Sequence, residues 1–304
     1  MAMNLHLLRI FFNVAREGSF SRAAEALHIS QPAVSKGVRE LEHQLDVALV
    51  ERAQRQGGAK SRVKLTPIGE VLFEHARGIF ALEKAAIDDI HARVGLRKGA
   101  LVVGASTTIA GYWLGPYLAL FADAWPDIAI EVRAGNTESV SRWLIDCEVD
   151  VALVEGAVAD ERLESRHWQQ DALIIIGPPD WAQSLSGSSL DALNGERWVL
   201  REPGSGTREV TRQLMADLKI APASLMEAGS NEAIARSVAC GAGLAIVPRV
   251  VAADLLELGR VTLIEPPAMP ALSRPLYQLF HRDRRLSPAA GRFVDFLEGS
   301  TAES

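Results

Sequence analysis

The stretch at residues 21–42, SRAAEALHISQPAVSKGVRELE, gathers side chains that could read nucleic acid. On a helix that begins after Ser30, an apolar stripe from Val34 to Leu41 would leave polar groups on the other side. That polar side and its flank hold Gln31, Pro32, Ser35, Lys36 and Arg39. Amide, hydroxyl and cationic groups pair with base edges and phosphates, so this face predicts contact with DNA.

The residues around this stretch predict three short helices that hold the polar face in place. Asn4 can cap a first helix that ends at Gly18, Ser21 can cap a second, and Ser30 can cap the third after a tight turn. Pro32 fits the first turn of the third helix, where its missing N–H costs nothing. This order predicts a helix-turn-helix unit, whose second helix enters the major groove. A plain three-helix bundle is the alternative, but it does not explain the alanine-rich helix, the tight turn and the first-turn proline together.

Charge is distributed unevenly along the 304 residues. The chain has a formal net charge of -6, yet residues 1–66 hold ten Lys or Arg against six Asp or Glu, a local net charge of +4. The remaining residues therefore carry -10. A basic head on an acidic body is typical of a protein that touches a polyanion through its head alone, and chance surface composition is the alternative.

Composition also bounds the cellular setting and the chemistry. No apolar run approaches the roughly 20 residues that span a bilayer, and the start lacks the features of a signal peptide. Two cysteines, Cys147 and Cys240, cannot form a disulfide framework, so a cytoplasmic setting is expected. The seven histidines show no metal-ligand spacing, and we expect no metal site.

A long helix is expected after Thr66, with Pro67 in its first turn. Its apolar positions are Ile68, Leu72, Ala76, Ile79, Phe80, Ile87, Ile90 and Val94. A helix of about 27 residues would measure about 40 Å. So long a stripe needs a partner, which is either the body of the same chain or the same helix of a second subunit.

From Gly99 onward the pattern alternates between strand and helix. Strands are expected at 100–104, 128–134, 151–154, 173–176, 197–200 and 244–247. Helices are expected at 111–124, 138–147, 207–218 and 231–239, and a last strand and helix follow at 275–280 and 288–297. The alternation predicts mostly parallel sheets arranged in two similar halves.

Polar residues follow several of these strands. Ligands of open α/β sheets lie beyond the carboxyl ends of the strands, beside helix N-termini. The residues at these positions are Ser106, Thr107, Thr108, Asn136, Glu155, Ser205, Gly206, Thr207 and Asn231. Hydroxyls and backbone N–H groups there suit a small anion, although Ser, Thr and Asn also cap helices throughout proteins. Glu155 would repel an anion unless it is protonated, paired or turned away, and it could instead bind a cationic or hydroxylated ligand.

Residues 1–66 resemble the winged helix-turn-helix domain of the LysR-type transcriptional regulators. The ordered motif of that family stands here as Ser19, Ser21, Ala23-Ala24, Leu27, Ser30-Gln31-Pro32-Ala33-Val34-Ser35 and Leu41-Glu42, followed by Leu65-Thr66-Pro67-Ile68-Gly69. One departure is the run AQRQGGAKSRVK at residues 53–64, which lengthens the short wing of the family and adds Arg55, Lys60 and Arg62.

The resemblance implies a multidomain α and α/β protein. A winged helix-turn-helix would occupy 1–66, a linker and dimerisation helix 67–95, and a two-lobed, periplasmic-binding-protein-like effector domain 99–304. Lobe 1 would comprise about 99–168 and 269–304, and lobe 2 about 169–268. DNA contacts are then expected from Ser21, Arg22, Ser30, Gln31, Pro32, Ser35, Lys36, Arg39, Arg52, Arg55 and Arg62.

The same resemblance implies the partners of the chain. They are double-stranded operator DNA, a small co-inducer in place of a bound cofactor, and a second copy of the chain in a homodimer or homotetramer. RNA polymerase is a further candidate partner, and no membrane contact is expected.

An enzyme and a redox sensor are the two alternative functions. The run Gly204-Ser205-Gly206-Thr207 resembles a phosphate loop, but it lacks the G-x-x-x-x-G-K-[ST] pattern, and no G-x-S-x-G elbow occurs, so we expect no enzyme. A redox sensor would use Cys147 and Cys240. Cys147 falls in the expected apolar helix Trp143–Cys147, where a buried and inert thiol is favoured.

Overall fold

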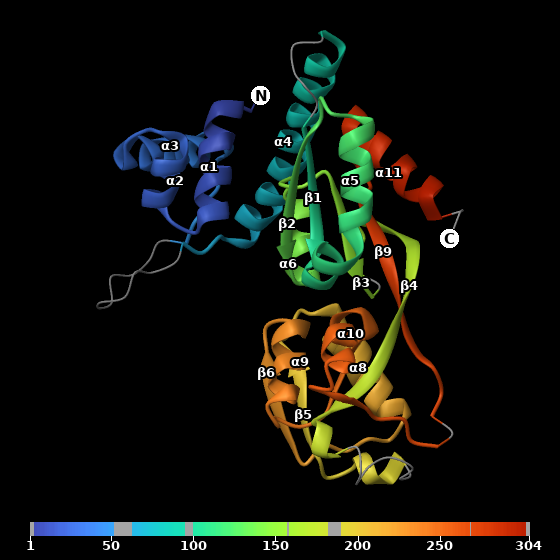
Figure 1. Ribbon diagram of the computed structural model, residues 1–304. Helices are drawn as coiled ribbons and strands as arrows, with labels where there is room; N and C mark the ends of the chain where they lie inside the picture. Colours follow the sequence, from blue (N-terminus) through green and yellow to red (C-terminus); the bar gives the residue numbers. More distant parts are fainter. Residues whose placement is uncertain are drawn as a thin grey trace. The chain divides into compact units, whose positions relative to one another are not determined.

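The computed structural model describes residues 3–51, 63–94, 100–156, 158–181, 190–267 and 269–301 (Figure 1). The described chain forms two compact units, of which one ends at Ala86 and the other begins at Ile87. No helix among the described residues is long and apolar enough to cross a membrane.

The first unit is helical and begins with the expected helix-turn-helix. Its helices are α1 (Leu5–Glu17), α2 (Phe20–Leu27), α3 (Gln31–Leu45) and the larger part of α4 (Pro67–Val94), which continues into the second unit. Asn4 caps α1 and Ser30 caps α3 through their side chains, as expected. The prediction for α2 was wrong, because Ser19 is its N-cap and Ser21 lies inside its first turn. Ser19 precedes the helical turn and accepts the N–H of Arg22, which is what a cap requires.

Two motif residues, Glu42 inside α3 and Thr66 just before α4, hold the segment that connects these helices. Oε1 of Glu42 accepts the N–H groups of Leu49 and Val50 at 2.8 and 3.2 Å. Thr66 donates its hydroxyl to the carbonyl of Ala48 at 2.7 Å and accepts the N–H of Gly69, which opens α4. A Cβ at Gly69 would lie 2.0 Å from the Leu49 carbonyl oxygen, so only glycine fits there.

Part of the apolar face of α4 is packed in the core of the first unit, and another part is exposed to solvent. Leu72, Phe73, Ile79 and Phe80 pack against the core of the first unit, in which Phe12 contacts both phenylalanine rings. Part of the expected stripe is therefore used within the chain itself. The exposed large apolar side chains of α4 are Ile68, Val71, Leu82, Ile87 and Ile90.

The second unit contains a seven-stranded sheet in the order β2-β1-β3-β9-β4-β7, with β8 paired to β4. The strands are β1 (Ala100–Ser106), β2 (Ala129–Gly135), β3 (Val151–Glu155), β4 (Leu163–Gly177), β7 (Ala245–Pro248), β8 (Thr262–Leu263) and β9 (Leu272–His281). β1 pairs with β2 and β3 in parallel, but β9 and β4 run antiparallel to their neighbours. The expectation of mostly parallel sheets was therefore wrong for this sheet. β4 is also far longer than the expected strand at 173–176.

A second sheet pairs β5 (Arg197–Arg201) with β6 (Ser224–Ala228) in parallel. The helices of the second unit are α5 (Leu114–Ala124), α6 (Thr137–Ile145), α8 (Gly206–Asp217), α9 (Asn231–Ala239), α10 (Arg249–Glu257) and α11 (Pro288–Thr301). Shorter turns are a π-helical turn at Ile109–Trp113 and 3₁₀ turns at Pro179–Trp181 and Leu190–Leu193.

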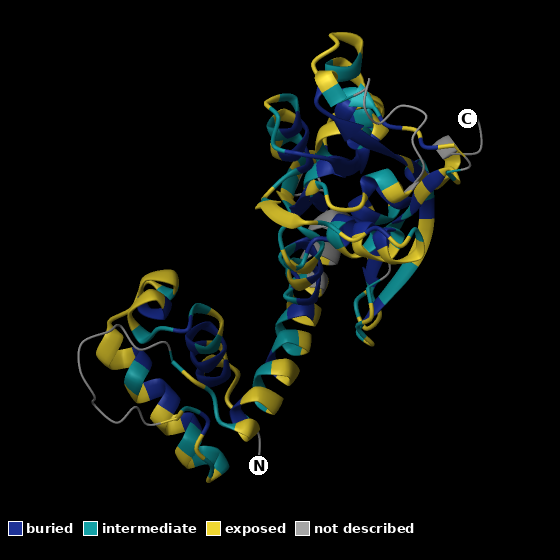
Figure 2. Ribbon diagram, turned by 90° about the horizontal axis from the view of Figure 1, so that it is seen from below, coloured by how far each residue is buried: buried dark blue, intermediate teal, exposed yellow. Residues whose placement is uncertain are grey.

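Each of the two halves of this unit has its own buried core. Buried residues are dark blue in Figure 2. In lobe 1, α5 and α11 pack on β1 and β3, with Phe121 edge-on to Phe293. In lobe 2, β5 and β7 pack between α8 on one side and α9 with α10 on the other. β4 and β9 run through both lobes as paired strands (Figure 1). Their register shifts between His167 and Gln169, and the paired residues Asp171 and Arg274 lie just beyond that irregularity.

Candidate functional site

The exposed face of α3 presents the predicted DNA-reading residues. Gln31, Pro32, Lys36 and Arg39 are exposed and Ser35 is half-buried, whereas Val34, Gly37, Val38 and Leu41 are buried. A Cβ at Gly37 would lie 2.7 Å from Ile10 Cδ1, so the inner face of α3 packs tightly on α1. The outer face is thereby fixed toward solvent.

Two of the predicted DNA-binding cations, Arg39 and Arg22, form hydrogen bonds within the described part of the first unit, and Lys36 does not. Arg39 donates its Nε–H to the Ser35 carbonyl at 3.2 Å, and Arg22 donates to the carbonyl of Glu17. Lys36 has no hydrogen-bond or ion-pair partner among the residues that the structure describes. Ser21 is exposed and Ser30 is used as a cap. Arg52, Arg55 and Arg62 lie outside the described residues.

Lobe 1 contributes the ends of β1 and of β2 to a polar cluster. Ser106 accepts the N–H of Ile109 through Oγ, and Thr108 is fully buried just before a π-helical turn, a rare feature that is frequent at functional sites. Asn136 caps α6 through the N–H of Ser139. Together these residues place three helix-start positions of lobe 1 beside lobe 2.

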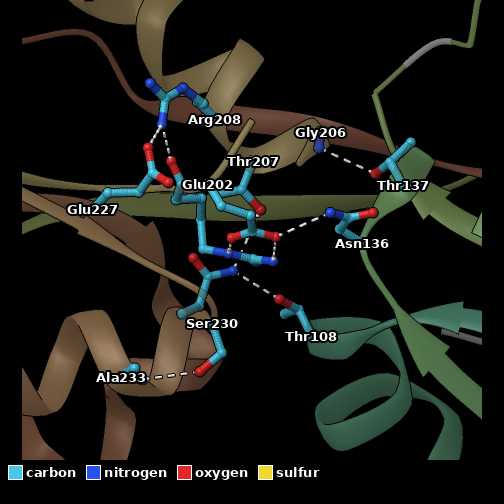
Figure 3. A network of polar contacts seen from close by, with 12 residues as sticks. Thr108, Asn136, Thr137, Glu202, Gly206, Thr207, Arg208, Glu227, Ser230 and Ala233 are labelled. Atoms are coloured by element: carbon cyan, nitrogen blue, oxygen red, sulfur yellow. Dashed lines mark hydrogen bonds and ion pairs between the residues drawn. The ribbon is translucent and has the colours of Figure 1, made fainter. Parts of the chain in front are cut away.

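Hydrogen bonds connect this group directly to lobe 2 (Figure 3). Asn231, at the first turn of α9, donates from Nδ2 to Oγ1 of Thr108 at 2.8 Å. The backbone N–H of Gly206, at the first turn of α8, donates to Oγ1 of Thr137 at 3.1 Å. A Cβ at Gly206 would lie 2.0 Å from the Glu155 carbonyl oxygen, so the close approach of α8 to β3 requires glycine. The two lobes therefore meet at helix N-termini.

A buried arginine lies at the centre of this meeting point. Arg274, on β9, is 0% exposed and forms ion pairs with Asp171 at 2.8 Å and with Glu155 at 3.3 Å. It also donates from its NH1 nitrogen to Oγ1 of Thr207, which accepts from Asn231 as well. Glu155 is therefore paired with a cation. The sequence predicted that Glu155 would repel an anion unless it was protonated, paired or turned away, and the second of these conditions is met.

Among these three side chains, burial shifts the pKa of Asp171. Burial raises the pKa of Asp171 above its ordinary value, the nearby charge of Glu155 adds to the rise, and Arg274 opposes it. Two carboxylates facing one guanidinium leave a surplus negative charge when both are ionised. A ligand that brings hydrogen-bond donors, or a proton taken up by Asp171, would offset that surplus.

A second buried arginine lies nearby at the end of β5. Arg201 is 3% exposed, and its guanidinium holds the carboxylate of Glu202 through two hydrogen bonds of 2.8 and 2.9 Å. Glu202 also accepts from Nδ2 of Asn136 in lobe 1 at 3.3 Å. Burial favours a higher pKa for Glu202, but the bonds from Arg201, from its own backbone N–H and from Asn136 lower the pKa overall.

Contacts bring most of the predicted effector residues together. Ser205 is buried beside Gly206, but its side chain makes no capping bond to α8. Four buried oxygens in the cluster have no hydrogen-bond partner among the described residues: Thr107 Oγ1, Glu155 Oε1, Asp171 Oδ1 and Asn231 Oδ1. Glu155 Oε1 is nevertheless held in the ion pair with Arg274, so within the described part of the chain the unused acceptors of the cluster are Thr107 Oγ1, Asp171 Oδ1 and Asn231 Oδ1.

Sequence reasoning missed four members of the cluster: Asp171, Arg201, Glu202 and Arg274. Arg274 comes one residue before the expected last strand, and Arg201 one residue after the expected fifth strand. The signal that could have identified Arg201 and Arg274 is a cationic residue directly beside a mainly apolar strand.

The cysteines are separate from this cluster and from each other. Cys147 is buried, Cys240 is exposed, and neither forms a disulfide. Cys147 follows α6, which ends at Ile145, so the expectation that it belongs to that helix was wrong. Among the described residues no group of three or more His, Cys, Asp or Glu could hold a metal ion.

Comparisons with known proteins cover nearly the whole chain. The family model "Bacterial regulatory helix-turn-helix protein, lysR family" matches residues 5–70, and "LysR substrate binding domain" matches residues 95–302. The "Uncharacterized HTH-type transcriptional regulator YeiE" of Escherichia coli K12 is 32% identical over 298 residues, which are 98% of each chain. The "RuBisCO operon transcriptional regulator" of Allochromatium vinosum is 32% identical over 99% of this chain and 98% of its own. The solved structure of a full-length OxyR variant from Pseudomonas aeruginosa has a TM-score of 0.69 at 25% identity, covering 99% of this chain and 95% of that one.

Proposed function

The chain belongs to the LysR-type transcriptional regulators, which are DNA-binding proteins with an effector-binding domain and not enzymes, and from this premise we propose how it reads DNA and which effector it senses. A small effector, an anion by preference, binds between lobes 1 and 2. Its binding changes the DNA-bound state of the protein.

DNA reading rests on the exposed face of α3. Gln31 and Ser35 are positioned to meet base edges, and Lys36 and Arg39 to meet bases or phosphates. The support is the burial of the opposite face against α1 and the unpaired state of Lys36 among the described residues. Ser21, Arg22, Ser30 and Pro32, with Arg52, Arg55 and Arg62 in the wing, complete the proposed contact set.

The observation that carries the effector site is the direct bonding of lobe to lobe at helix N-termini. Asn231 donates a hydrogen bond to Thr108, and the backbone N–H of Gly206 donates one to Thr137. The backbone N–H of Glu138 donates to the carbonyl of Gly204 at 3.0 Å. Helix N-termini attract anions through their dipoles and N–H groups. A ligand that competes for these bonds would favour one arrangement of the lobes by its difference in affinity for the two.

Dimerisation completes the proposal. Ile68, Val71 and Leu82 are exposed on α4, and at 3.6 residues per turn they fall within about 60° of one another around the helix. Such an apolar strip would be covered by the same helix of a second subunit. Two heads would then read a two-fold operator. Assembly into a tetramer, contact with RNA polymerase and a cytoplasmic location belong to the same proposal.

A thermal-shift screen tests the effector class. A ligand that binds only the folded protein raises its melting temperature, so small anions, carboxylates, amines and amino acids are compared on the wild type. We expect an anion to give the largest rise. Thr108→Ala and Ser205→Ala should weaken that ligand about 10- to 100-fold, the scale for hydrogen bonds to a charged group. A rise produced only by amines or neutral polyols would reject the anion, and unchanged responses in both variants would place the site elsewhere.

A further inference from the structure

We propose that the carboxylate of Glu202 is a built-in substitute for the effector anion, which must displace it from Arg201 to bind. This inference rests on the proposed effector site and names the receptor group within it. The chemistry that Arg201 would recognise is a planar carboxylate or a tetrahedral oxyanion such as sulfate, because a guanidinium binds both through paired N–H groups.

The geometry of Glu202 is that of a bound anion. Its two oxygens take the Nε–H and an Nη2–H of Arg201 at 2.8 and 2.9 Å, and one of them also takes Nδ2 of Asn136 from the opposite lobe at 3.3 Å. A free carboxylate held by a buried arginine and a cross-lobe amide would make the same three contacts. In Figure 3 the Glu202 carboxylate lies beside Thr207 and faces Asn136, to which a dashed line runs.

Glu202 is the resident carboxylate that can leave most easily. The carboxylates around Arg274 are closed in, because the side chains of Glu155 and Asp171 are only 3% and 1% exposed. The side chain of Glu202 is 23% exposed while Arg201 beneath it is 3% exposed. Glu202 also starts the turn through Pro203 and Gly204, outside any strand or helix. A swing of its side chain would return one charge to water and leave a buried guanidinium ready for another anion.

The displacement would also act on the lobes. In the present arrangement Glu202 joins Arg201 of lobe 2 to Asn136 of lobe 1. An effector anion that takes its position holds the same two groups but is not tethered to the loop before α8. The state of that loop would therefore report whether the site holds its own carboxylate or an external one.

The test is the affinity of inorganic sulfate for the full-length protein, measured by titration calorimetry near neutral pH at constant ionic strength. Glu202→Gln removes the competing charge and should bind sulfate at least about tenfold tighter than the wild type, which corresponds to about 1.4 kcal/mol. Adding Arg201→Gln to that variant should abolish the gain. Glu202→Asp, which keeps the charge on a shorter side chain, should give a smaller gain and serves if Glu202→Gln folds poorly.

Glu227→Gln is the matched control. Glu227 is an exposed carboxylate of lobe 2 paired with Arg208 at 2.8 Å, so its neutralisation changes the net charge equally without freeing Arg201. Its sulfate affinity should stay within about twofold of the wild type. Equal affinities in Glu202→Gln and Glu227→Gln, a gain that survives loss of Arg201, or no saturable sulfate binding in any variant would each overturn the inference.

These outcomes are separate from failure of the proposed function. If an anion found by the thermal-shift screen alters operator binding while Glu202→Gln behaves like Glu227→Gln, the effector site stands and the substitution by Glu202 is wrong. If Glu202→Gln shows the gain but no anion alters operator binding, the receptor is real and its regulatory role is wrong.

Discussion

Asn231 and Thr108 are 123 residues apart in the chain, yet the amide of one donates to the hydroxyl of the other at 2.8 Å with both side chains fully buried. One residue starts α9 of lobe 2 and the other follows β1 of lobe 1. Two polar groups that were expected to hold a ligand thus hold each other. This bond is one of the contacts that join the two lobes.

Removing this bond should weaken the second unit. Thr108→Val deletes the acceptor while keeping the shape of the side chain, and it leaves Nδ2 of Asn231 with Thr207 alone at 3.3 Å. We expect a loss of about 1–3 kcal/mol in the free energy of unfolding, the cost of a buried donor that loses its partner. Urea unfolding followed by tryptophan fluorescence reports on this unit, because all six tryptophans lie after residue 87.

Ser273→Ala is the control for that change. It removes the hydroxyl that Gln170 contacts at 2.9 Å, but both side chains are exposed. A loss within about 0.5 kcal/mol is expected. Equal losses in the two variants would mean that the Thr108 bond is no stronger than a surface contact.

Stability should depend on pH through Asp171. Its pKa is raised in the folded protein, so between its ordinary and its raised pKa the folded state binds more protons than the unfolded state. The contribution is fully present below the ordinary pKa and is lost as the pH rises through the raised one. The free energy of unfolding of the wild type, relative to Asp171→Asn, should therefore increase as the pH is lowered through this window. A difference that stays flat or decreases on acidification would show that the pKa of Asp171 is not raised.

Operator binding should depend on the outer face of α3. Lys36→Ala and Arg39→Ala should each weaken binding, by about 1–3 kcal/mol if a base contact is lost. If a phosphate contact is lost, the slope of log K against log salt should fall by about 0.9 for each contact. Fluorescence anisotropy with labelled promoter DNA at several salt concentrations separates the two. Arg292→Ala, an exposed arginine on α11, is the control with the same change of charge and should leave both affinity and slope unaltered.

Dimerisation should depend on the exposed strip of α4. Val71→Glu with Leu82→Glu places two charges where a second subunit is proposed to pack, and light scattering should show a monomer at micromolar concentration. Leu258→Glu is the control, because Leu258 is 72% exposed just after α10. A wild type that is itself monomeric would contradict the proposal, as would a double variant that remains dimeric.

The packing of α4 decides which of its apolar residues can be replaced without unfolding the first unit. Leu72 and Ile79 belong to the apolar pattern of the sequence, but they contact the core around Phe12. Replacing them would unfold the head as well as disturb any dimer. Periodicity identifies an apolar face, and it does not say which neighbour covers each part of it.

Local signals in the sequence predicted the helices of the first unit and the starts of α6, α8, α9 and α11 to within one residue, but they did not predict α10. Caps such as Ser30, the first-turn Pro32 and the polar residues after β1 act within a few residues of their partners. The helix cap at Ser19 was missed because Ser21 offers the same chemistry two residues later. Choosing between them needs the backbone angles, and Ser19 has the extended conformation of a cap.

The resemblance implied that residues 269–304 return to lobe 1, but the antiparallel pairing of that last strand was not predicted. The antiparallel course of β9 beside β3 and β4 depends on a return of the chain after more than a hundred residues. That return brings Arg274 to Asp171, 103 residues away. The hydroxyl and amide residues of the site and the carboxylate of Glu155 were therefore predicted from the sequence, but Arg201, Glu202, Asp171 and Arg274, which also set its charge, were not.

The central claim, that an anion between the lobes controls the DNA-bound state, is tested most directly by operator binding measured with and without the anion that the thermal-shift screen selects. Anisotropy titrations at constant ionic strength should show that this anion changes the operator affinity of the wild type. The same anion should leave Thr108→Ala unaffected, although that variant binds the operator normally in its absence. Identical titration curves for the wild type with and without the anion, or an equal change in Thr108→Ala, would contradict the claim.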